Sequence, residues 1–115
     1  MALTQDEWLQ LQLLRAVDRA EPATPDALLG RVLAKAVGTG MYPVHKLDET
    51  GIHPLLAAWQ RADPRLVTND FSAADVDEGG RVREGARRVY TLTEAGEAEM
   101  ARLADKDDYH SNPPP

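Results

Sequence analysis

The apolar residues of this chain repeat at helical spacing in three successive segments, and two short strand-like stretches follow them. An amphipathic helix shows apolar positions about every 3.6 residues, whereas a strand is a short run bounded by turn signals. A further helical segment comes after the second strand. We therefore expect helices at residues 4–20, 25–37, 48–62 and 93–104, and strands at residues 66–71 and 87–92.

Small polar residues and glycines support these boundaries. Thr24 precedes a proline, and a threonine cap followed by proline is a typical helix start. Gly40 ends that helix, residues 41–47 are expected to form a connector, and Asp48 is expected to cap the third helix. The loop between the strands is long and polar, and its Gly79-Gly80 pair favours a turn.

This order of elements predicts a winged helix-turn-helix, a mainly α fold with a small β hairpin in the order α-α-α-β-β-α. The third helix would be the recognition helix. Its inward stripe is expected to consist of Ile52, Leu55, Leu56 and Trp59. We expect the winged-helix DNA-binding domain to span residues 1–104, and residues 105–115 to form an acidic, disordered tail that ends in prolines.

The first helix has an unusually wide apolar arc, made of two stripes. An arc of this width covers more than one partner surface. One stripe is expected to face the core, and the other is either core as well or a surface for a second subunit or a ligand. The first stripe contains Leu9, Leu13, Ala16, Val17 and Ala20, and the second contains Trp8, Leu11 and Leu14.

Composition and charge narrow the class of protein. Apolar residues make up 43% and charged residues 28%, and there is no cysteine, which excludes disulfides and thiolate metal sites. The formal net charge is −6, but residues 81–88 hold four arginines and one acid, Glu84, so the rest of the chain carries −9. A basic element on an acidic body is compatible with DNA contact through one edge. The sequence shows no basic leader and no long apolar run, which predicts a cytoplasmic protein without a membrane segment.

Two stretches carry a family resemblance. Residues 47–56 place Leu47, Ile52, Pro54 and Leu56 as the start of the recognition helix does in PadR-type bacterial transcriptional regulators. Residues 87–96 resemble the second wing strand and the following threonine-glutamate-x-glycine helix start of PadR-like and MarR-like winged helices. The resemblance implies a transcriptional repressor that binds DNA as a homodimer and is sometimes relieved by a small-molecule effector.

The expected DNA contacts lie on the recognition helix and the wing. Wing arginines can follow phosphates or enter the minor groove, and Arg61 could read guanine from the exposed face of the helix. The alternative is ordinary surface, with wing arginines paired to Asp75, Asp77 or Glu78. The expected contact residues are Lys46, Thr50, His53, Ala57, Arg61, Arg81, Arg83, Arg87 and Arg88.

No residue pattern indicates catalysis. The three histidines lack metal-ligand spacing, and Gly38-Thr-Gly40 follows a helix, whereas a phosphate-binding loop precedes one. We therefore expect no enzyme activity, cofactor or metal, and we expect double-stranded DNA as the partner. The net charge of −6 favours an alternative function, in which the winged helix contacts other proteins and does not bind DNA.

Overall fold

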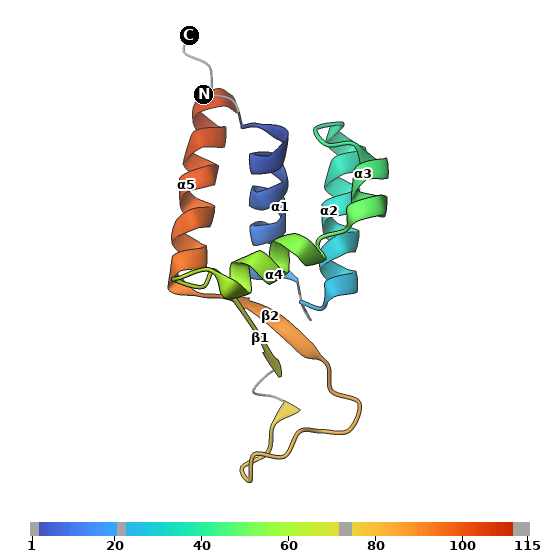
Figure 1. Ribbon diagram of the computed structural model, residues 1–115, viewed down its shortest axis with the longest axis vertical. Helices are drawn as coiled ribbons and strands as arrows, with labels where there is room; N and C mark the ends of the chain where they lie inside the picture. Colours follow the sequence, from blue (N-terminus) through green and yellow to red (C-terminus); the bar gives the residue numbers. More distant parts are fainter. Residues whose placement is uncertain (1–2, 21–22, 72–74, 112–115) are drawn as a thin grey trace.

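The computed structural model describes residues 3–20, 23–71 and 75–111, without the side chains of residues 48, 50 and 107–111. Helices α1, α2 and α5 stand side by side with α1 in the middle, α4 crosses their lower ends, and the hairpin projects away from them (Figure 1). The elements are α1 Gln5–Arg19, α2 Pro25–Thr39, α3 Val44–Thr50, α4 His53–Arg61, β1 Val67–Phe71, β2 Arg88–Leu92 and α5 Glu94–Ser111.

This arrangement is mainly helical with one antiparallel hairpin, in an order compatible with a winged helix, which confirms the predicted fold class. The predicted start and end of the second helix also hold. Thr24 accepts a hydrogen bond from the Ala27 amide at 3.4 Å, and Gly40 ends α2 in the left-handed conformation. Among the helices described, none has the length and apolar character needed to cross a membrane.

The predicted third helix, residues 48–62, is wrong in its first part. Two helices, α3 and α4, occupy this region, and α3 begins inside the predicted connector, residues 41–47. Gly51 separates them with a φ of 67°, which glycine adopts readily and other residues rarely adopt. Pro54 then lies in the first turn of α4, where proline favours a helix start. Asp48 therefore lies within α3 and is not the cap of the recognition helix.

Helix α1 is the centre of the core. It contacts α2, α5 and β2, so apolar residues are needed on most of its circumference. Trp8 is 5% exposed, and Leu11 and Leu14 are fully buried. The Trp8 ring stacks on Tyr42 with centroids 6.3 Å apart. The second apolar stripe is thus filled by contacts within one chain, and the expectation that Trp8, Leu11 and Leu14 form a dimer or ligand surface is corrected.

The inner side of α4 agrees with the predicted stripe. Ile52, Leu56 and Trp59 are buried, and Leu55 is half-buried against the same core. The helix packs on β1, and the Trp59 carbonyl accepts a hydrogen bond from the Leu66 amide at 3.1 Å. This bond joins the end of α4 to the start of the hairpin.

The hairpin is attached to the helices at its base. Val67 pairs with Leu92 at that end, and Phe71 pairs with Arg88 at the other. The Tyr90 amide donates to the Ala23 carbonyl at 2.9 Å, which connects β2 to the segment between α1 and α2. Val67 and Tyr90 are buried, whereas residues 75–88 of the outer part are largely exposed. The wing therefore has a packed base and a solvent-exposed tip.

The last helix is longer than predicted. Thr93 caps it as expected, accepting from the Gly96 amide at 3.1 Å, but α5 continues to Ser111 and does not end near Ala104. Residues 105–111 are therefore helical, and the expectation of a disordered tail is corrected there; residues 112–115 lie outside the described part. Lys106 on this extension donates to Glu7 Oε2 at 2.6 Å, so the extension is held against the start of α1.

The contact between Glu7 and Lys106 makes part of the protein's folding stability dependent on pH. The hydrogen bond from Lys106, followed by that from the Thr4 backbone amide, lowers the pKa of the Glu7 carboxyl. A lowered pKa in the folded state contributes stability above the ordinary range of glutamate, and this contribution is lost as pH falls through the lowered pKa. We expect Glu7→Gln to lower Tm at neutral pH and to converge with the unmodified protein in acid. Thermal unfolding across this range measures it, and a difference independent of pH contradicts it.

Candidate nucleic-acid interface

The outer side of α4 presents three of the residues that the sequence predicts as DNA contacts. His53 and Arg61 are exposed at opposite ends of the helix, and Ala57 is half-buried between them. Lys46 lies on α3 and is exposed, with its ammonium 5.8 Å from the centre of the Tyr42 ring. Thr50 ends α3, and its side chain lies outside the described part. The structure therefore places Lys46 on a separate short helix and not in a loop before α4.

The wing tip is built by backbone hydrogen bonds and one aspartate. Val76 and Val82 form an isolated bridge beyond the main hairpin. Asp77 closes the turn, because its carboxylate accepts from the amides of Gly79 and Arg81 at 2.9 and 2.8 Å. Gly80 has a φ of 81°, and its amide donates to the Asp77 carbonyl. This confirms the turn predicted at the glycine pair.

All four wing arginines are exposed, but their surroundings differ. Arg83 forms an ion pair with Asp75 at 3.1 Å, one of the pairings weighed from the sequence. The guanidinium of Arg88 lies 5.4 Å from the centre of the Phe71 ring, its partner in the strand register. Arg81 and Arg87 form no ion pair with any other described residue. Three arginines therefore keep a positive charge that no described carboxylate neutralises.

The wing as a whole is less basic than residues 81–88 alone. The returning side, residues 81–88, holds the four arginines and Glu84 and has a formal charge of +3. The outgoing side, residues 75–80, holds Asp75, Asp77 and Glu78 and has a charge of −3, so residues 75–88 together carry zero. A polyanion would therefore meet net positive charge only along the returning side.

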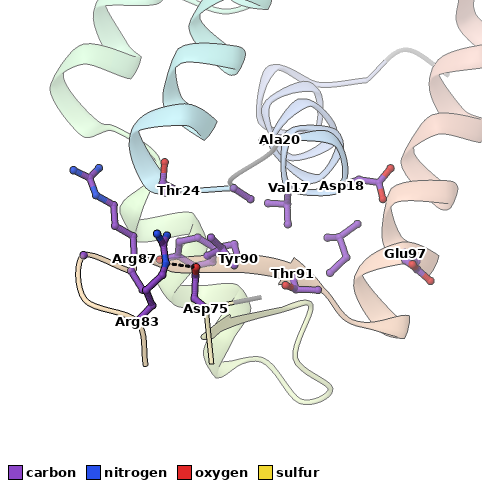
Figure 2. Close-up of a pocket in the computed structure, with 15 residues that line it drawn as sticks. Val17, Asp18, Ala20, Thr24, Asp75, Arg83, Arg87, Tyr90, Thr91 and Glu97 are labelled. Carbon is purple, nitrogen blue, oxygen red and sulfur yellow. Dashed lines mark hydrogen bonds and ion pairs between the residues drawn. The ribbon is translucent and has the colours of Figure 1, made fainter. Parts of the chain in front are cut away.

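A cavity of about 750 Å³ lies between the base of the wing and the end of α1. Figure 2 shows Arg83, Arg87 and Asp75 at one end and Asp18 and Glu97 at the other. Between these ends lie Val17, Ala20 and Tyr90. The cavity thus has a basic end, an apolar middle and an acidic end. No local pattern predicts it, because its walls come from α1, the wing and α5.

The described residues contain no group of three or more histidine, aspartate or glutamate side chains that could hold a metal ion. A scan against known protein families, a search of curated proteins and a search of solved structures each found no match. The functional assignment therefore depends on the geometry and chemistry of this chain.

Proposed function

We propose that this protein is a DNA-binding transcriptional regulator, acting as a repressor. The exposed side of α4 would enter the major groove, and the basic side of the wing would follow the adjacent phosphate backbone. The observation that carries the proposal is a set of exposed cations on α4 and on the wing, which follows α4 in the chain. They are Arg61 on α4 and Arg81, Arg87 and Arg88 on the wing. Arginine suits both tasks, because its planar guanidinium binds phosphate and guanine in two-point contacts.

Two further features belong to the same proposal. The protein would act as a cytoplasmic homodimer on a near-palindromic site, since two-fold operators are read by two-fold proteins. A small-molecule effector would bind in the cavity at the base of the wing. That cavity shares Arg87 with the proposed DNA contact and is also lined by Arg83 of the wing, so an occupant would change the position or charge of the wing.

We expect Arg87→Ala/Arg88→Ala to weaken binding to specific and random duplexes by about the same factor. Each lost phosphate contact should lower the slope of log affinity against log salt by about one unit. Gel shifts against genomic fragments at low and moderate salt would first select a specific fragment, and fluorescence anisotropy would then measure both duplexes. The charge-matched control is Arg19→Ala/Arg102→Ala on α1 and α5, away from the wing, which should leave the salt dependence unchanged. Equal affinity and slope for the wing variant and the unmodified protein would exclude the wing as a DNA contact.

Arg61→Ala tests the other element of the interface. If Arg61 reads a base, its loss should cost the specific fragment roughly 1–3 kcal/mol and random DNA much less. The same anisotropy titrations measure the difference. An equal loss on both duplexes would place Arg61 on the phosphate backbone.

Protein contact is the second candidate function. The net charge of −6 and the three acids on the outgoing side of the wing favour it over DNA. Absence of any salt-dependent binding in the gel shifts would leave this function as the better one.

A further inference from the structure

A second hollow lies on other elements of the fold, between α1 and α2. These helices stand next to each other (Figure 1), and the groove between them has a volume of about 650 Å³. Four of its lining residues are cationic, and none is acidic. The cations are Arg15, Arg19, Arg31 and Lys35.

The four cations form two facing pairs. Arg15 and Arg19 lie one turn apart on α1, and Arg31 and Lys35 lie one turn apart on α2. A helix rises about 6 Å over four residues, so each wall presents two charges at roughly that spacing. Arg15 is half-buried and the other three are exposed. The charges thus border the groove on both sides.

Small residues leave the space between the two walls open. Ala16 lines the groove from α1, and Ala34 and Gly38 line it from α2. A Cβ added at Gly38 would have no atom within 4 Å. The buried Gln12 also lines the groove. The groove therefore combines cationic residues with small residues and one buried polar residue.

The fold does not use these charges internally. None of the four cations forms an ion pair with another described residue. Like charges one turn apart on a helix repel each other and destabilise it. The chain has 19 acids and 13 basic residues, yet four cations and no acid line this groove, which gives it a local positive charge.

We propose that the α1–α2 groove binds a short oligophosphate, a group of two or three adjacent phosphoryl units. Three of the four cations are arginines, whose forked donors match phosphate oxygens. The lining contains no aromatic residue, so the groove offers no aromatic platform on which a nucleobase could stack. The ligand is either an inorganic oligophosphate or the phosphate end of a nucleotide.

Calorimetric titration of the full chain with tripolyphosphate, ATP without magnesium, and monophosphate tests this proposal at constant ionic strength. We expect saturable binding of tripolyphosphate and at least about tenfold weaker binding of monophosphate. ATP that binds as tightly as tripolyphosphate would indicate that phosphates alone are recognised. ATP that binds much more tightly would show that a base is recognised, which contradicts the proposed chemistry.

Two variants locate the site. Arg19→Gln/Arg31→Gln removes one exposed cation from each wall, and Ala34→Met fills the groove while all four charges remain. Both should weaken tripolyphosphate binding by about tenfold or more, whereas the charge-matched Arg65→Gln/Arg102→Gln should change it by less than about twofold. Circular dichroism confirms folding of each variant. Equal affinity in groove and control variants, or no saturable binding, would overturn the proposal.

The same variants separate this site from the DNA interface. We expect them to bind duplex DNA as the unmodified protein does, because the groove lies on elements that the proposed DNA contact does not use. Loss of duplex binding in Ala34→Met with no loss of tripolyphosphate binding would overturn the oligophosphate assignment. If the wing variants bind duplex DNA as the unmodified protein does, the proposed DNA interface is wrong, and the oligophosphate site is unaffected.

Discussion

Trp59→Ala should lower the free energy of unfolding by about 3–5 kcal/mol, the range expected when a large buried aromatic side chain is removed. Trp59 is 5% exposed and belongs to the stripe that holds α4 against the core. The Trp59 carbonyl also accepts a hydrogen bond from the Leu66 amide, so the residue lies where α4 is connected to the hairpin. A domain of this size has a total stability of roughly 5–15 kcal/mol, so the variant should lose a large part of it.

Urea unfolding followed by far-ultraviolet circular dichroism measures this effect, since tryptophan fluorescence would change with the substitution itself. Arg61→Ala is the matched control, because it truncates an exposed residue two positions along the same helix. The control should stay within about 0.5 kcal/mol of the unmodified protein. A loss below about 1 kcal/mol for Trp59→Ala would mean that α4 is not packed as the structure shows.

Local signals predicted the first two helices well and the middle of the chain less well. Thr24 and Gly40 have strong local preferences for helix ends, and both end α2 as predicted. Helix α3 has only seven residues, too few to show a helical period, so its first part falls within the stretch that the sequence predicts as a connector. Aspartate is also a common N-cap residue, so Asp48 favours a helix start at that position. The actual break between α3 and α4 lies three residues later, at Gly51.

The apolar pattern of α1 predicted how wide its buried arc is but not what covers it. Periodicity describes the angle over which a helix is apolar, and this angle is the same for contacts within one chain and between two. Because α1 lies between α2 and α5 and also touches β2, Leu11 and Leu14 are needed inside the single chain. Only the three-dimensional arrangement distinguishes these alternatives.

The candidate sites also contain some features that the sequence predicts and others that only the three-dimensional arrangement shows. Strand alternation predicts that at least one of Arg87 and Arg88 is exposed, and the structure has both exposed. The cavity at the wing base and the α1–α2 groove could not be predicted from the sequence. Each is lined by residues from different elements, such as Val17 and Glu97 in the cavity and Arg15 and Lys35 in the groove. These residues are separated in the sequence, and no spacing rule relates them.

Gly96 belongs to the sequence motif at the start of α5 and lies against the backbone of Leu66, a contact that mutation can test. The threonine-glutamate-x-glycine start of α5 packs directly on the end of the α4–β1 connection. The Thr93 hydroxyl donates to the Arg65 carbonyl, and the Thr93 amide donates to the Leu66 carbonyl at 3.0 Å. A Cβ at Gly96 would lie 2.1 Å from that Leu66 oxygen and 3.1 Å from its carbonyl carbon. Both are backbone atoms, so α5 or the base of the wing would have to move.

Gly96→Ala should therefore destabilise the protein by about 3 kcal/mol, at the upper end of the usual cost of overpacking. The sign is informative, because alanine normally stabilises a helix by roughly 0.5–1 kcal/mol relative to glycine. Gly30→Ala on α2 is the matched control, since a Cβ there would have no atom within 4 Å. It should raise Tm, whereas Gly96→Ala should lower it. If both alanine variants raise Tm, the close approach of α5 to Leu66 does not exist in solution, and the base of the wing is not held by this contact.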